Sequence, residues 1–160
     1  MMEKAREALG LTKEESEAVS QLTIHPREAN SGPSFYEAFA LRGIRVDRVE
    51  PGFVACTFKV PPRLTQDASG NLSPGAIVGL VDEVGAAAIH IEGFPIEVSV
   101  DMSIAYLSAA RANDELEVTS KALGCKGCYF GTIVQLKNKA TGEVVAEGRH
   151  SLYGKARSKI

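Results

Sequence analysis

Hydrophobic and polar positions change their spacing twice along this chain. Apolar and polar residues alternate from residue 44 to 60, residues 74 to 90 are apolar almost throughout, and alternation returns from 97 to 153. Alternation predicts strands with one buried face, whereas a long apolar run that begins with helix-start residues predicts a helix covered on most sides. The pattern therefore predicts two strands, one apolar helix and four further strands.

The first two strands are predicted to form a hairpin that turns at Pro51-Gly52. One face of this hairpin is apolar and contains Val54, Cys56, Phe58 and Val60. The later strands are predicted over 97–107, 115–124, 129–139 and 144–153. In the first of these four, alternation places on one side Val98, Val100, Met102, Ile104 and Tyr106.

The residues before the first strand show helix signals instead. Thr12 and Glu15 have the form of a capping box, which predicts a helix through Leu22. A short second helix is predicted to end at Gly43, because glycine commonly follows the last helical residue.

The order of these elements predicts an α+β fold. Hairpin-length links between the late strands indicate an antiparallel sheet, and a helix that is apolar on all sides must be covered. We therefore expect the hot-dog architecture, a curved antiparallel sheet of about six strands wrapped around one long central helix. The expected organisation is a helical extension over 1–43, the hot-dog domain over 44–154 and a tail over 155–160.

Two adjacent carboxylates interrupt the apolar helix. Asp82 and Glu83 are about 100° apart around a helix, so they cannot share a direction. Asp82 lies two turns after Gly75 and on the same side, where the missing side chain suggests the close approach of a ligand or another backbone. Burying an unpaired carboxylate is costly. We therefore interpret Asp82 as functional, and Glu83 as a solvated carboxylate or a partner at a subunit interface.

Composition narrows the class of protein. The 160 residues are 44% hydrophobic and 24% charged, with a net charge of −2. This balance supports one domain with a real core and argues against a nucleic-acid binder or a disordered chain. The longest uncharged apolar run, Leu72 to Val81, is about half of the ~20 residues that a membrane span requires.

The cysteines and the ends of the chain bear on the compartment. Cys56, Cys125 and Cys128 are an odd number and predict no disulfide framework, which favours a reducing compartment. The start MMEKAREALG lacks the apolar core of a secretory signal, so we expect a soluble intracellular protein. The ending Ser158-Lys159-Ile160 is close to a peroxisomal import signal, and the alternatives are a frayed basic terminus and a cytoplasmic protein.

The pair Cys125 and Cys128 has the spacing of a metal or redox motif. Zinc would need two further ligands at suitable spacing, and a thioredoxin-like motif belongs near a parallel strand-helix-strand unit. Neither is evident in the sequence, so we interpret the cysteines as small residues in a strand link and expect no metal or cofactor.

Three stretches together carry a resemblance to a known family. They are LVDEVGAAAI at 80–89, VSVDMSIAYLS at 98–108 and NKATGEVVAEGRHSLYG at 138–154. In these stretches and their spacing, the sequence resembles the small hot-dog acyl-CoA thioesterases over about residues 52 to 154. The resemblance implies metal-free hydrolysis of acyl-CoA to a free acid and CoA, and a place in fatty acid metabolism.

The resemblance also implies catalytic residues. In the family, the aspartate of LVD activates water and the serine of VSVD assists it, which correspond to Asp82 and Ser99. A backbone N–H at the helix start polarises the thioester carbonyl; Pro74 has none, so Gly75 is the nearest substitute. The family's helper asparagine aligns with Asp67, and because a carboxylate would repel an oxyanion, Gln66 or Asn71 could donate instead.

Further residues are implied as contacts to CoA, at Asp101, Tyr106, Gly124, Lys126, Gly127, Cys128 and Tyr129. Lys126 suits a phosphate by its charge. Because family members build each site from two chains, the resemblance implies at least a homodimer, commonly a homotetramer. Two alternatives stay open: an acyl-CoA-binding protein with weak or no turnover, motivated by Pro74 and Asp67, and a thioesterase for an aromatic acyl-CoA.

Overall fold

The computed structural model describes residues 12–21, 34–66, 68–90 and 96–154, together with Lys4 and Gly10. Asp67 and the ending at residues 158–160 therefore lie outside the described residues. The contacts divide the chain into two units, Met1–Phe35 and Tyr36–Ile160.

The first unit contains the predicted capping box. Helix α2 spans Lys13–Ser20, and Thr12 at its start accepts a hydrogen bond from the Glu15 backbone N–H at 3.2 Å. The Glu15 carboxylate accepts in turn from the Thr12 backbone N–H at 2.8 Å. The hydrogen bonds that Thr12 donates to the Glu15 carboxylate stabilise its ionised form and therefore lower its pKa. Leu22, the predicted end of this helix, lies outside the described residues.

The second unit is an antiparallel sheet that curves around one long helix. Helix α3 spans Phe35–Leu41 and is followed by Gly43, whose φ of +101° is one that glycine adopts without strain. The strands are β1 (Ile44–Glu50), β2 (Phe53–Lys59), β3 (Ile96–Tyr106), β4 (Glu115–Lys126), β5 (Tyr129–Asn138) and β6 (Val144–Gly154). Between β2 and β3 lie a short 3₁₀ turn, Pro62–Leu64, and helix α4, Pro74–His90.

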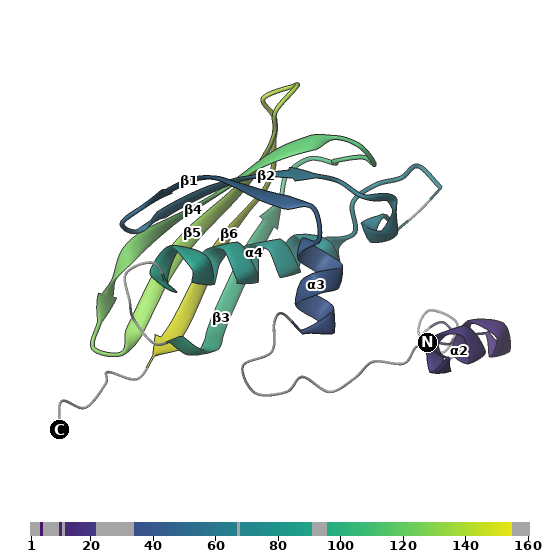
Figure 1. Ribbon diagram of the computed structural model, residues 1–160, viewed down its shortest axis with the longest axis horizontal. Helices are drawn as coiled ribbons and strands as arrows, with labels where there is room; N and C mark the ends of the chain where they lie inside the picture. The colour runs from purple at the N-terminus through teal and green to yellow at the C-terminus, as the bar shows by residue number, and fades with distance from the viewer. Residues whose placement is uncertain are drawn as a thin grey trace. The chain divides into compact units, whose positions relative to one another are not determined.

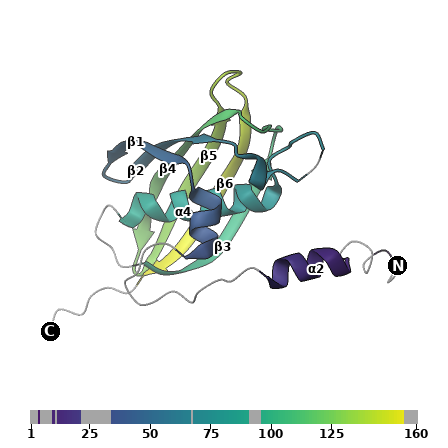
Figure 2. The ribbon, with the colours of Figure 1, turned by 45° about the vertical axis from the view of Figure 1, so that its right-hand side comes forward.

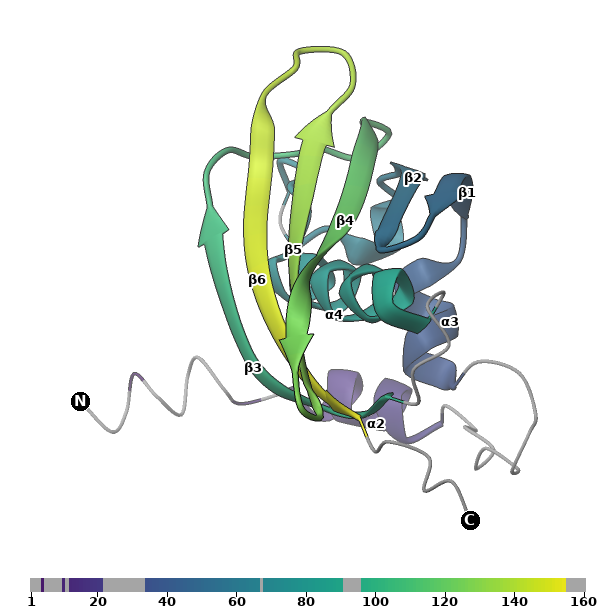
Figure 3. The ribbon, with the colours of Figure 1, turned by 90° about the vertical axis from the view of Figure 1, so that its left-hand side faces the viewer.

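The sheet order is β1-β2-β4-β5-β6-β3, with every neighbouring pair antiparallel. Helix α4 lies along the concave face of the sheet (Figures 1 and 2). Viewed from the side, β3, β6, β5 and β4 form a curved wall, and β2 and β1 continue it next to β4 (Figure 3). The hot-dog architecture predicted from the sequence is confirmed.

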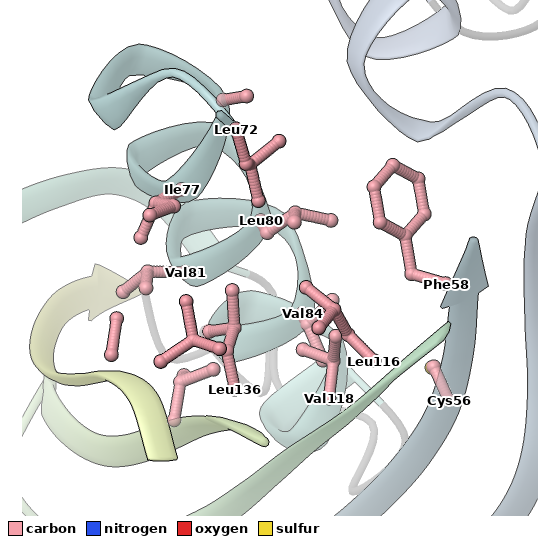
Figure 4. Packing of buried hydrophobic residues seen from close by; sticks show 14 of the residues in the cluster. Cys56, Phe58, Leu72, Ile77, Leu80, Val81, Val84, Leu116, Val118 and Leu136 are labelled. Atoms are coloured by element: carbon pink, nitrogen blue, oxygen red, sulfur yellow. The ribbon is translucent and has the colours of Figure 1, made fainter. Parts of the chain in front are cut away.

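The core lies between the inner face of the sheet and α4 (Figure 4). The face predicted for the first hairpin is confirmed, since the exposed fraction does not exceed 2% for any of Val54, Cys56, Phe58 and Val60. Helix and sheet also approach closely at Gly148 on β6, where a Cβ atom would meet a methyl group of Val81 at 2.6 Å. A side chain at that position would overpack the core.

Strand β3 departs from the alternation that its sequence predicts. Its pairing with β6 is irregular between Ser99 and Asp101, because Ser99 is opposite Leu152 and Asp101 is opposite Ser151. Val100 is therefore the extra residue of a bulge, which exchanges the two faces of the strand at this point. The prediction that Val98 shares a side with Met102 and Ile104 was wrong, because Val98 lies before the bulge and these two residues lie after it. Ser99 faces inward on one side of the bulge, and Met102, opposite the buried His150, faces inward on the other.

Candidate active site

The start of α4 carries one backbone amide without an acceptor among the described residues. Ser73 caps the helix, and its Oγ and carbonyl oxygen accept from the Ala76 N–H at 3.2 and 3.1 Å. The Ile77 N–H donates to the Ser73 carbonyl at 3.2 Å, and Pro74 has no N–H. Within the part of the chain that the structure describes, the Gly75 N–H thus has no acceptor, and it lies at the positive end of the helix. A Cβ atom here would meet nothing within 4 Å, so the space beside the Gly75 Cα is open.

Asp82 lies two turns further along α4 and is held by Ser99. The Ser99 hydroxyl donates to Oδ1 of Asp82 at 2.7 Å. This contact exists because the β3 bulge turns Ser99 toward α4 rather than away from it. The Asp82 side chain is 42% exposed, so it remains accessible to water. A carboxylate that is oriented by a hydroxyl and open to water can act as a general base.

A third polar side chain approaches Asp82 from β6. His150 has a side-chain exposure of 0%, and its Nε2 lies 3.2 Å from Asp82 Oδ1. Among the described residues, neither ring nitrogen has an aligned hydrogen-bond partner, although the distance to Oδ1 is within hydrogen-bond range. Burial lowers the pKa of His150, which the negative charge of Asp82 only partly offsets. The ring is therefore neutral at neutral pH, with one N–H to donate.

Three cavities meet around Glu83. The helix-start cavity, of about 380 Å³, is lined by residues that include Ser73, Gly75, Gly79, Asp82 and Glu83. The Ser99 cavity, of about 210 Å³, is lined by Asp82, Glu83, Ala86, His90, Val98, Ser99 and Leu152. The half-buried Glu83 belongs to both and also to the third cavity. Burial is the main cause that raises its pKa, with smaller contributions from the charges of Glu37 and Asp82.

The third cavity is almost entirely apolar. This apolar cavity has a volume of about 510 Å³ and lies between α4 and the β1–β2 hairpin. Its lining is Leu41, Ile44, Val46, Val49, Val54, Cys56, Glu83, Val84, Ala86, Ala87 and His90. It shares Glu83, Ala86 and His90 with the Ser99 cavity, so the two cavities adjoin along one ridge of α4. Burial raises the pKa of the Cys56 thiol to about 11, which makes this cysteine unreactive at neutral pH.

The residues predicted to contact CoA are not gathered at Asp82. Gly124, Lys126 and Tyr129 line a separate cavity of about 430 Å³ at the β4–β5 hairpin. This hairpin cavity shares no lining residue with the three cavities around Glu83. Gly127 occupies the hairpin turn with a φ of +61°, and the neighbouring Cys128 is partly buried. Asp101 and Tyr106 are exposed on β3.

The described part of the chain contains no group of three or more histidine, cysteine, aspartate or glutamate side chains that could hold a metal ion. Within the same part, no helix is long and apolar enough to cross a membrane.

Sequence reasoning missed His150. The three histidines are far apart in the chain, and His150 occupies a strand where alternation alone predicts an ordinary inward residue. One signal was present at Gly85, a poor helix former three residues after Asp82 and therefore on its side of the helix. A Cβ atom at Gly85 would lie 2.7 Å from His150 Nδ1, so the missing side chain makes room for the ring.

A hot-dog sheet with a carboxylate on its central helix is the framework of a known class of hydrolases. The family model described as the thioesterase superfamily matches residues 69–124. Acyl-coenzyme A thioesterase 13 from Homo sapiens is 39% identical over 103 residues, which are 63% of this chain and 72% of that protein. The chain therefore belongs to the thioesterase superfamily and is a thioester hydrolase.

Particular relatives define its branch more closely. Acyl-coenzyme A thioesterase 13 from Mus musculus is 35% identical over the same shares of both chains. The crystal structure of zebra fish thioesterase superfamily member 2 superposes with a TM-score of 0.69 at 33% identity, over 76% of this chain and 87% of that one. A hypothetical thioesterase with coenzyme A from Streptococcus pneumoniae has a TM-score of 0.70 over 76% and 93% of the two chains; at 20% identity it supports the fold alone.

Proposed function

We propose that this protein hydrolyses acyl-CoA thioesters to a free acid and CoA, using water that Asp82 activates and no metal. The observation that carries the proposal is the arrangement on one side of α4, where Ser99 holds Asp82 and the Gly75 N–H has no acceptor among the described residues. The relatives named acyl-coenzyme A thioesterase 13 support the choice of substrate.

The proposed chemistry follows from these positions. Asp82 takes a proton from water as the water oxygen bonds to the thioester carbon, and the Gly75 N–H stabilises the negative carbonyl oxygen. The tetrahedral intermediate then breaks its C–S bond, and the CoA thiolate leaves and takes up a proton. Asp82 lies seven positions after Gly75, about 10 Å along the helix axis, and its side chain leans toward the helix start. The remaining gap suits a carbonyl group and one water molecule.

The apolar cavity supports an aliphatic acyl group. It adjoins the Ser99 cavity at Ala86, whose small side chain leaves room between the two cavities. Val46 and Val84 provide part of its apolar lining. Each methylene that moves from water into such a lining contributes about 0.8 kcal/mol. We therefore propose that the acyl chain runs past Ala86 into this cavity and that longer chains are bound more tightly.

Thiol release from a panel of acyl-CoAs tests the function. The expected result is that kcat/KM rises from short to medium and long aliphatic chains and is lower for an aromatic acyl-CoA. Preference for the aromatic substrate would favour the alternative enzyme. Tight acyl-CoA binding by calorimetry with negligible thiol release would favour the binding protein, an outcome motivated by Pro74, which has no N–H to donate at the helix start.

The same panel, measured with Ala87→Phe, tests whether the acyl chain occupies the apolar cavity. The phenyl ring would fill part of the apolar cavity, so we expect KM to rise for long chains while kcat/KM for a short chain changes little. Ala109→Phe adds the same volume at an exposed position outside the cavities and serves as the control. An equal effect of Ala87→Phe on all chain lengths would contradict this location of the chain.

We further propose that each site is completed by a second copy of the chain. The edge strand β3 has an unpaired side, and hydrophobic residues on and just after it are more than 50% exposed, namely Val98, Val100 and Leu107. An exposed apolar edge strand is a template for pairing. The hairpin cavity, which contains the predicted CoA contacts, shares no residue with the Ser99 cavity, which contains Asp82. The two could therefore belong to one site if the hairpin cavity came from a second copy of the chain.

Light scattering and complementation test the shared site. We expect the mass of a dimer or tetramer, and partial recovery of activity when Asp82→Asn and Lys126→Ala chains are mixed after unfolding, since mixed dimers hold one intact site. A monomeric mass, or no recovery from chains that are each weakly active, would contradict the proposal.

A further inference from the structure

The strongest unexplained feature near the proposed site is the buried ring of His150. A polar group that is removed from water without a hydrogen bond is costly, about 1–3 kcal/mol. His150 is 1% exposed overall, and both of its ring nitrogens lack an aligned partner within the described ranges. The Oδ1 atom of Asp82, 3.2 Å from Nε2, is the acceptor that the structure brings into range.

The neighbouring strands and helix α4 place the His150 ring next to Asp82. His150 lies on β6 between Thr132 of β5 and Met102 of β3, and it faces α4. Gly85 of α4 lies beside Nδ1, since a Cβ atom at this position would come within 2.7 Å of that nitrogen. The Thr132 hydroxyl donates to the His150 backbone carbonyl at 3.5 Å rather than to the ring. Nδ1 therefore faces a bare stretch of helix, while Nε2 faces the carboxylate.

We infer that His150 is a positioning residue for the proposed hydrolysis, in which its Nε2–H and the Ser99 hydroxyl together hold Oδ1 of Asp82 and leave Oδ2 to the attacking water. This inference rests on the proposed function. Two donors on one oxygen fix the rotation of the carboxylate, because Ser99 approaches from β3 and His150 from β6. Loose hydrogen bonds of this kind tighten when substrate is bound.

The charge state of the ring agrees with a donor role. Asp82 is the described carboxylate whose charge acts on His150, and Ser99 and Thr132, which flank the two groups, are uncharged. Burial keeps the imidazole neutral, so it carries a single proton. With that proton on Nε2, the ring donates to the carboxylate; with the proton on Nδ1, two lone pairs would face each other at 3.2 Å.

Three substitutions at one position separate positioning from folding. His150→Leu keeps the buried volume but removes the donor; His150→Gln places an amide N–H near the position of Nε2, and His150→Asn places one near Nδ1. We expect His150→Leu to unfold at a temperature no lower than wild type, because it removes the buried Nδ1, which has no partner among the described residues, and Asp82 keeps its hydrogen bond from Ser99. We also expect its kcat to fall about 10- to 100-fold with little change in KM, because a misplaced catalytic group costs up to about 10²-fold.

Rescue by the two amide substitutions completes the kinetic test. His150→Gln is expected to recover most of the lost kcat, and His150→Asn to resemble His150→Leu. Wild-type kcat in His150→Leu, or equal kcat in the Gln and Asn variants, would overturn the inference even where acyl-CoA hydrolysis itself is observed.

Nitrogen NMR of the ring tests the inference without turnover. In wild-type protein we expect the shifts of a neutral ring protonated at Nε2, and a change of the Nε2 shift in Asp82→Asn. A neutral ring protonated at Nδ1, or shifts that do not respond to Asp82→Asn, would overturn it. This measurement needs no substrate, so it distinguishes failure of the inference from failure of the proposed function.

Discussion

Asp82→Asn is expected to lower kcat for acyl-CoA hydrolysis by about 10²- to 10⁴-fold, the usual contribution of a general base. An amide has nearly the shape of the carboxylate and still accepts from Ser99 through its oxygen, but it cannot take a proton from water. The loss corresponds to about 3–5 kcal/mol of transition-state stabilisation, so kcat and kcat/KM should fall together. Thiol release at saturating acyl-CoA, with the binding constant measured by calorimetry, checks this result.

Glu117→Gln is the matched control. It makes the same chemical change on an exposed residue of β4 that lines none of the described cavities, so kcat should stay near wild type. Equal turnover by wild type and Asp82→Asn would remove this carboxylate from the mechanism. A similar loss of activity in both variants would indicate an effect of net charge instead.

Gly75→Pro is expected to lower kcat by about 10²- to 10³-fold, the usual loss when one oxyanion donor is removed. Proline is accepted in the first turn of a helix, and the Gly75 N–H has no acceptor among the described residues, so no hydrogen bond of the fold is lost. The loss should appear in kcat and kcat/KM alike, because the amide acts on charge that develops only in the transition state.

Gly75→Ala separates the amide from the glycine itself. Alanine keeps the N–H, and its Cβ would meet no protein atom within 4 Å, so the fold should tolerate it. We expect a rise in KM if the methyl group touches substrate, with kcat far less affected than in Gly75→Pro. Similar kcat in the two variants, at equal unfolding temperatures, would show that the oxyanion is held elsewhere.

The local elements were predictable because their signals are local. The Thr12–Glu15 capping box, the Pro51-Gly52 turn and the apolar run of α4 each depend on residues within a few positions of one another. The three stretches that resemble hot-dog thioesterases were a second, independent source, and the comparisons confirm the family that they indicated. That resemblance, rather than the alternation of β3, pointed to Ser99 as the partner of Asp82.

The sequence pattern failed where long-range pairing decides the outcome. Alternation on β3 assigned Ser99 to the face opposite Met102, but the bulge at Val100 brings both to the inner side. A one-residue change of register moves a side chain to the other face of a sheet, and the register is set by hydrogen bonds to β6, not by β3 alone. His150 was missed for a related reason, because its position against Gly85 exists only when β6 lies on α4.

By itself, then, the sequence determined which segments are helix and strand, which faces are apolar and which family the chain resembles. The tertiary structure decided which polar atoms meet at Asp82, where Ser99 and His150 approach one oxygen, and it left the Gly75 N–H, two turns earlier, without an acceptor among the described residues. The physical reason is that periodicity reports burial along one segment, whereas the distance between side chains of different segments depends on strand register and on helix-to-sheet packing.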